Sequence, residues 1–190
     1  KGECLMRYRN EVLLSPKSIR QGLGGPLIAS QGMPSTSAAW SGLGGSNRAT
    51  FCPIRFSAPG IITKLWWRNG SAVSGNVDIG LFGIGTDKLP GARIVSSGSV
   101  AQSGTGVIQE VNITDYAVEF PQVLYVGLVL DNNTGAIFSG FVGTQYARAM
   151  GFVGQASAFP LPSTPAATPG GLTGSSVATD FGVAFRALVA

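Results

Sequence analysis

Apolar and polar residues alternate in short stretches throughout residues 61–142, and Gly, Ser, Asn and Asp residues separate these stretches. Successive side chains of an extended strand point to opposite faces, so a period of two predicts half-buried β-strands. Short strands divided by turn signals at roughly ten-residue intervals are typical of sandwiches and jelly rolls. The pattern therefore predicts an all-β chain, folded as an antiparallel β-sandwich of jelly-roll type.

The segment 61–68 gives the sharpest prediction of which side chains are buried. Alternation predicts a core face with Ile61, Thr63, Leu65 and Trp67, and an opposite face with Ile62, Lys64, Trp66 and Arg68. An exposed indole with hydrogen-bond donors beside it is suited to hold a sugar ring, so Trp66, Lys64 and Arg68 form the candidate ligand site or interface. The alternative, which we favour, is that Trp66 packs on a second layer or a partner chain.

Other segments extend the predicted sandwich in both directions. Residues 50–56 form its first strand, with Pro53 placing it toward a sheet edge. In the strand that begins near Asn76, Val77, Ile79 and Leu81 point inward while Asp78 and Gly80 face water. In segment 107–114, the inner face is expected to carry Val107, Val111 and Ile113.

The later part of the chain contains the most apolar strand. Residues 123–130 have no polar face, which predicts a strand in the middle of a sheet with both sides covered. Residues 136–142 are expected to return as a hairpin arm, residues 143–154 to add another strand, and residues 180–189 to close the sheet. Between them, the Pro-, Ser- and Thr-rich loop 155–179 is predicted to lie over a neighbouring subunit or to project as a tip.

Charge divides the chain at residue 48. The first 48 residues carry six basic and two acidic residues, which equals the formal net charge of +4 for all 190 residues. This asymmetry predicts a basic, Gly-rich N-terminal arm (1–48) and a sandwich domain (49–190). Docking on a neighbouring subunit is the favoured role of the arm, ahead of a solvated arm. Nucleic acid is the least favoured partner, because the cations are spread out without interleaved aromatic residues. The candidate anchoring residues are Arg7, Arg9, Lys17 and Arg20.

Composition points to burial against other chains. Hydrophobic residues make up 44% of the sequence and charged residues only 12%, about half the usual share of a soluble domain. No apolar run approaches the length of a membrane span, so membrane insertion is not expected. The apolar surplus favours contact with neighbouring subunits over a merely thick core.

Cys4 and Cys52 are expected as buried thiols. The sequence begins at Lys1 and shows no signal peptide, so a processed or truncated start is expected.

Catalytic chemistry finds little support in the residue inventory. The sequence has no histidine, which excludes Ser-His-Asp and Cys-His arrangements and leaves zinc only cysteines and carboxylates. Glycoside hydrolysis needs two carboxylates at a set separation, and the sequence cannot place any pair of its nine carboxylates so closely. The run Asp131-Asn132-Asn133 lacks calcium-loop spacing and is interpreted as a turn. We therefore predict a non-enzymatic chain with no catalytic residue, cofactor or metal, and a small hydrolase is only a remote alternative.

Several strand-and-turn stretches carry a family resemblance. They are Val-Asp-Ile-Gly-Leu-Phe at 77–82, Ser-Ser-Gly-Ser at 96–99, Ala-Gln-Ser-Gly-Thr at 101–105, Asn-Ile-Thr-Asp at 112–115 and Leu-Tyr-Val-Gly-Leu at 124–128. Together they resemble the small jelly-roll modules of tailed-bacteriophage virion proteins, such as head fibres, capsid decorations, baseplate and tail-fibre domains. The resemblance implies a non-enzymatic structural subunit located in the virion. It also implies other virion proteins as partners and a homo-oligomer, with a trimer favoured. The alternative is a receptor- or carbohydrate-binding module of a phage tail or fibre, centred on Trp66, with a glycan or host receptor as partner.

Overall fold

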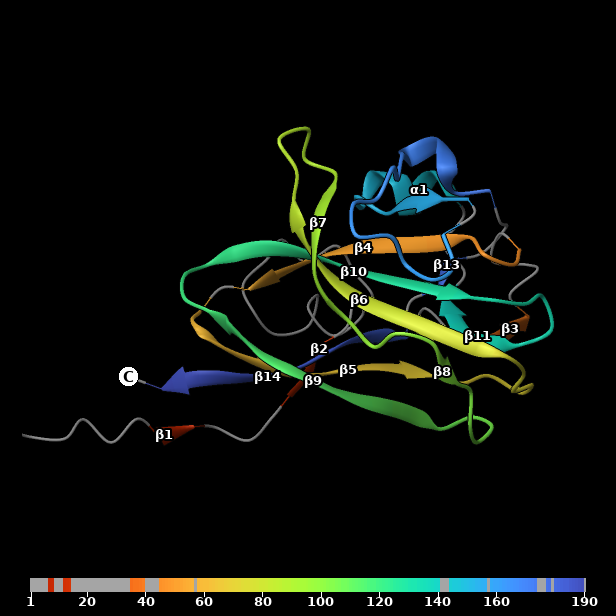
Figure 1. The fold of residues 1–190 in the computed structure, drawn as a ribbon, viewed down its shortest axis with the longest axis horizontal. Coiled ribbons are helices and arrows are strands. Elements are labelled where there is room, and N and C mark those ends of the chain that lie inside the picture. Colours follow the sequence, from red (N-terminus) through yellow and green to blue (C-terminus); the bar gives the residue numbers. More distant parts are fainter. Residues whose placement is uncertain are drawn as a thin grey trace, which may run out of the picture.

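The protein is an antiparallel β-sandwich with a small third sheet at its side (Figure 1). A computed structural model describes residues 7–8, 12–14, 35–39, 45–56, 58–140, 144–156, 158–173, 177–178 and 180–189. The chain passes from one main sheet to the other between β4 and β5 and again between β5 and β6. The all-β sandwich expected from the alternating pattern is therefore confirmed.

The two main sheets are named here after their central strands. The β10 sheet has the order β12-β4-β10-β6-β7, and β8 also pairs with β6. Its strands are β12 (Val153–Gln155), β4 (Ala49–Phe56), β10 (Gln122–Leu130), β6 (Asn76–Ile84), β7 (Pro90–Ser96) and β8 (Val100–Ala101). The β5 sheet has the order β1-β14-β5-β9, and β2 also pairs with β14. Its strands are β1 (Arg7–Tyr8), β14 (Phe181–Val189), β5 (Gly60–Arg68), β9 (Ile108–Val118) and β2 (Val12–Leu14).

A third sheet and a helix differ from what was expected for the later part of the chain. It consists of β13 (Val177–Ala178), β11 (Ala136–Gly140) and β3 (Ser35–Ala39). The β11 strand pairs with β3 and β13, so the prediction that this segment returns beside β10 as a hairpin arm is wrong. The segment 143–154 is not one strand either, because it contains helix α1 (Thr144–Ala149) before β12. Residues 141–143 lie outside the described residues.

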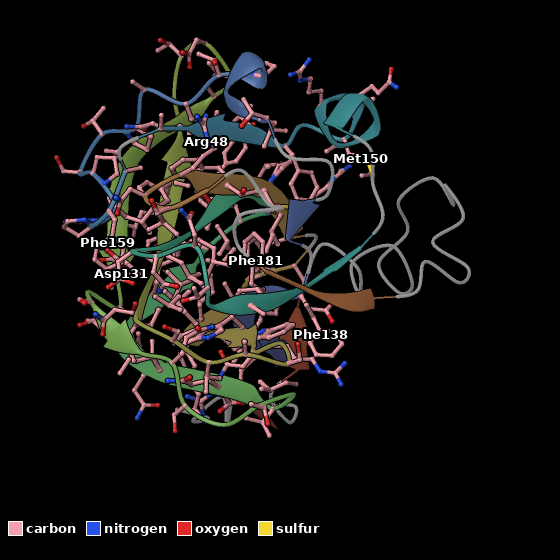
Figure 2. The ribbon with its side chains drawn as sticks, turned by 90° about the vertical axis from the view of Figure 1, so that its right-hand side faces the viewer. Arg48, Asp131, Phe138, Met150, Phe159 and Phe181 are labelled. Carbon is pink, nitrogen blue, oxygen red and sulfur yellow. The ribbon has the colours of Figure 1, made fainter. Side chains whose placement is uncertain are left out.

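Strand β10 has the two-sided burial that its sequence predicts. It lies between β4 and β6, and residues 124–130 are all buried. On the inner face, Leu124, Val126 and Leu128 contribute to the main core between the sheets. Phe181 of β14 lies in this interior, as Figure 2 shows. The closing strand predicted for residues 180–189 is confirmed by β14. Strand β10 contributes side chains to two apolar clusters, the main core on one face and a second cluster on the other.

A bulge in β5 changes which of its side chains face the core. In the pairing with β14, Lys64 lies opposite Ala184 and Ile62 lies opposite Phe185, so Thr63 is an extra residue on the β5 side. An extra residue shifts the alternation by one position. As a result Ile62, expected on the outer face, is fully buried in the main core with Leu65 and Trp67.

The Pro-rich segment covers the outer face of the β10 sheet. Its described part, residues 158–173, is called the strap here. Ala158, Leu161 and Ala167 of the strap pack with Phe51, Phe82, Tyr125, Val129 and Val153 in a second core cluster. The prediction of a projecting tip is therefore wrong for residues 158–173, and contact of this segment with a neighbouring subunit stays a prediction. Residues 157, 174–176 and 179 of the predicted loop lie outside the described residues.

Polar contacts fasten the strap to the sheet. The Arg93 guanidinium donates to the carbonyl oxygen of Leu161, and the Arg93 backbone N–H donates to that of Ser163 at 2.7 Å. Asp78 Oδ2 accepts the backbone N–H of Leu161 at 2.9 Å. Both Asp78 and Gly80 are buried, so the expectation that they face water is wrong, because the strap covers their side of β6.

We expect Asp78→Asn to leave the protein at least as stable as the wild type at pH 7. Burial raises the pKa of Asp78 above 3.8, and the hydrogen bond from Leu161 and the charge of Arg93 only partly oppose this shift. A raised folded-state pKa favours the protonated carboxyl, so its stabilising contribution is present at acidic pH and is lost as pH rises through the folded pKa. Asparagine stays neutral and retains an oxygen for Leu161. Urea unfolding should show wild type losing stability relative to Asp78→Asn as pH rises above 3.8 toward neutrality. An unchanged difference between the two proteins would contradict the expectation.

Described parts of the N-terminal 48 residues pair with the sandwich itself. Strands β1 and β2 lie along β14, and β3 lies along β11. Arg7 lies in β1, where only the backbone is described. The other candidate anchoring residues, Arg9, Lys17 and Arg20, lie outside the described residues, as does Cys4. The boundary at residue 48 and the anchoring role of the arm stay predictions.

Candidate interaction surface

Trp66 is buried, which contradicts the predicted sugar-binding platform. Only 6% of the residue is exposed, and its Nε1–H donates to the carbonyl oxygen of Val183 at 3.2 Å. Trp66 lies opposite Gly182 of β14, and the missing side chain at Gly182 leaves room for an indole that reaches over β14. No flat aromatic face is therefore offered to a ligand at this position, and the expectation of an exposed Trp66 is wrong.

The two cations beside Trp66 have separate partners. Lys64 Nζ lies 2.9 Å from Glu110 Oε2 of β9, and both side chains are about one-third exposed. An ion pair this exposed contributes about 0–1 kcal/mol. Arg68 stacks on the ring of Phe138 at 4.0 Å from the ring centroid, and its Nε–H donates to the carbonyl oxygen of Gly106 at 3.2 Å. Lys64 and Arg68 thus share a face of β5 without converging on one point.

Aliphatic side chains are exposed where β9 begins. Val107 is 48% exposed and Ile108 is 45% exposed, and Ile108 lies directly opposite Arg68 in the β5–β9 pairing. Val107 was expected on the inner face, so that prediction is wrong. Its backbone carbonyl accepts the N–H of Asn69, which ties residue 107 to the end of β5. Phe138, the stacking partner of Arg68, is labelled in Figure 2.

A buried amide network holds this end of β9 in place. Asn69 is fully buried, and its Oδ1 accepts the indole N–H of Trp67 at 2.8 Å and Gln102 Nε2 at 3.1 Å. Its Nδ2 donates to the carbonyl oxygen of Ser103 at 2.8 Å and to Gln109 Oε1 at 2.9 Å. All the hydrogen-bonding capacity of the Asn69 side chain is thereby used. The network rigidly positions the loop that leads into β9.

Strand β9 forms one margin of the β5 sheet and is called the β9 edge here. Among the described residues it pairs only with β5, although it is 11 residues long (Figure 1). None of its residues before Val118 is buried. Val111 and Ile113, whose inward orientation was expected, are only partly buried against the core. A long edge with unpaired backbone groups is a surface on which another chain can add a strand.

Acidic residues lie along the β9 edge, and basic residues do not. Residues 107–121 contain Glu110, Asp115 and Glu119 and neither Lys nor Arg. Glu110 pairs with Lys64 inside the sheet, whereas Asp115 and Glu119 are exposed and take part in no ion pair among the described residues. The acids are visible in the sequence, but the edge position of β9 is not. The sequence alone therefore gives no reason to single out this strand.

The other polar groups considered for chemistry have structural roles. Asp131 accepts the backbone N–H and the side-chain amide of Asn76 at 2.9 and 2.8 Å, and the amide of Asn132 at 2.8 Å. Burial acts to raise the pKa of Asp131, but these hydrogen bonds outweigh it and hold the pKa below its usual value. The side chain of Asp131 thus stabilises the turn that the sequence predicts. Within the described part of the chain, no cluster of three or more Cys, Asp or Glu residues is arranged to bind a metal ion, and no helix is long and apolar enough to span a membrane.

Comparisons with known proteins give this chain no relative. No protein-family model, no curated protein and no solved structure matches it. The resemblance to bacteriophage virion modules is tested by none of these comparisons and stays a prediction.

Proposed function

We propose that this chain is a non-enzymatic structural subunit of a virion, which acts through protein–protein assembly. The observation that carries the assembly role is the β9 edge, an 11-residue strand paired on one side only among the described residues. Exposed aliphatic side chains at its start add apolar area that a partner can bury. The virion setting, in a capsid decoration, head fibre or tail component, is supported by the resemblance of the strand-and-turn pattern.

A homo-oligomer, with a trimer favoured, is the proposed assembled form, alongside contacts with other virion proteins. The low share of charged residues, 12%, supports extensive burial between subunits. Light scattering on the full chain tests this directly by measuring its mass in solution. Removing the first 48 residues is a poor test, because strands β1, β2 and β3 of that region pair with the sandwich.

Replacing Ile108 with lysine is expected to weaken assembly while leaving the fold intact. Ile108 is 45% exposed at the β9 edge, so a lysine there can remain solvated in the monomer but must be desolvated in an interface. We expect the dissociation constant of the oligomer to rise about tenfold, equivalent to about 1.4 kcal/mol. Light scattering over a concentration series measures the change.

Ile84→Lys is the matched control for this substitution. Ile84 is 41% exposed and ends β6, in the other sheet. It should leave the mass in solution unchanged, and both variants should melt within a few degrees of the wild type. If both variants lose assembly equally, or if neither variant loses it, the result would argue against the β9 edge as the contact surface.

A further inference from the structure

The sequence contains a single pair of asparagine followed by glycine, Asn69 and Gly70, and such a pair can change chemically without an enzyme. In a flexible chain the glycine backbone nitrogen attacks the side-chain carbonyl carbon of the asparagine, because glycine has no side chain to hinder the approach. A C–N bond forms, and ammonia leaves with the proton of the attacking N–H. Water then opens the resulting succinimide ring to aspartate or isoaspartate, so the side-chain amide is lost.

The fold holds both reacting groups of this pair. Gly70 is buried, and its backbone N–H donates to the carbonyl oxygen of Ala136 at 2.8 Å. The Asn69 side chain is fully buried, and its oxygen and nitrogen are hydrogen-bonded to Trp67, Gln102, Ser103 and Gln109. Several of these hydrogen bonds must break before the nitrogen can attack and ammonia can leave, which makes the reaction unfavourable inside the folded molecule.

The backbone of the pair is fixed as well. The N–H of Asn69 donates to the carbonyl oxygen of Val107, and the carbonyl oxygen of Gly70 accepts the N–H of Gly106, both at 2.9 Å. Asn69 also forms an antiparallel bridge with Ile137 of β11. Two segments that are distant in sequence thus hold the pair, one leading into β9 and the other in β11. The pair can therefore react only in molecules in which this end of the β5 sheet has opened.

We propose that Asn69 is a deamidation site that the native fold closes and unfolding opens, so that prolonged unfolding becomes irreversible. The product cannot restore the buried network. The Ser103 carbonyl oxygen and Gln109 Oε1 accept hydrogen bonds from Asn69 Nδ2, and a carboxylate has no N–H to offer them. In aspartate a carboxylate oxygen would face these two acceptors in a buried site, which costs free energy. Isoaspartate adds a carbon atom to the main chain and so disturbs the bridge to Ile137.

Peptide mapping by mass spectrometry tests the protection by the fold. The full chain is incubated in mildly alkaline buffer with and without guanidinium chloride. In denaturant, the peptide that contains Asn69 should convert to its acid form. In native buffer this conversion should be slower by about a thousandfold or more, because roughly one molecule in a thousand or fewer is unfolded. Equal rates in the two samples would overturn the proposed protection.

Refolding tests the proposed irreversibility. Samples held in denaturant for increasing times are diluted into native buffer, and folded chains are separated from non-native chains by size-exclusion chromatography. The acid form should accumulate in the non-native fraction, while the folded fraction retains Asn69. Samples held for the same times in mildly acidic denaturant are the control, because acid suppresses attack by the backbone nitrogen, and their folded yield should not fall with time. An equal share of the acid form in the two fractions would contradict the proposal.

A substitution introduces one of the two products directly. Asn69→Asp should unfold at a lower denaturant concentration than the wild type at neutral pH, because it places a carboxylate in the buried network. Asn112→Asp, at an exposed position of β9, is the matched control and should unfold near the wild-type concentration. If Asn69→Asp is as stable as the wild type, the idea that deamidation prevents refolding is overturned.

Discussion

Replacing Trp67 with alanine is expected to lower the free energy of unfolding by about 3–5 kcal/mol. Trp67 is fully buried and is one of the largest side chains in the main core, where it lies with Leu65 and Phe181. Its removal leaves a cavity that the two sheets cannot close, because each is held by its own backbone ladder. The indole N–H also donates to Asn69 at 2.8 Å, and this bond is lost as well. Urea unfolding followed by tryptophan fluorescence and circular dichroism measures the change.

Trp66 offers an informative comparison at the neighbouring position. Because it is buried on the outer face of β5, Trp66→Ala should also destabilise the protein, by about 2–4 kcal/mol. Trp66→Phe keeps an aromatic ring but loses the hydrogen bond to Val183. The lost hydrogen bond should add about 1 kcal/mol to the cost of replacing the indole with a smaller ring. A Trp66→Ala variant as stable as the wild type would mean that the indole is exposed, contrary to the structure.

Replacing Asn69 with leucine is expected to cost about 2–4 kcal/mol of unfolding free energy. Leucine has a similar volume but makes none of the four side-chain hydrogen bonds of Asn69. The Trp67 indole N–H and the Ser103 carbonyl lose the partner that Asn69 supplies. Gln102 and Gln109 keep other partners, Ala136 and Ser103 N–H respectively, so they lose less. The cost therefore comes chiefly from polar groups left without a partner in a buried site.

The same substitution should loosen the loop that leads into β9. The backbone N–H groups of Ser103 and Gly106 are held by Gln109 and Gly70 next to the network, and their hydrogen exchange is expected to accelerate. Asn112→Leu, at an exposed position of β9 in the same sheet, is the matched control and should change stability by less than about 0.5 kcal/mol. Equal effects of the two substitutions would contradict a special role for the buried amide.

Properties that depend on neighbours along the chain were predictable from the sequence. The absence of any polar face in residues 123–130 correctly placed β10 in the middle of a sheet, because a strand without a solvated face must be covered on both sides. The closing strand and the core position of Trp67 followed from the alternation of apolar residues in the same way. The turn at Asp131 followed from residues such as Asn132, whose side-chain oxygen accepts the backbone N–H groups of Thr134 and Gly135.

Properties that depend on distant segments were decided by the tertiary structure. The bulge at Thr63 reversed the expected orientation of Ile62, and period-two reasoning fails wherever one extra residue enters a strand. The indole of Trp66 lies against a strand more than a hundred residues later, where Gly182 is opposite to it and the carbonyl oxygen of Val183 accepts its N–H. Asp78 is buried because the strap returns over its face of β6.

The candidate interaction surface belongs to this second group. The acids of residues 107–121 can be read directly from the sequence, and they look like an ordinary solvated strand face. Their significance appears only when β9 is found at the margin of the β5 sheet, with β5 as its partner among the described residues. Alternation encodes which side chains share a face, and so the sequence determined a two-layered β protein. Strand order depends on pairings between remote segments, so only the tertiary structure decided which strand is left with an open edge.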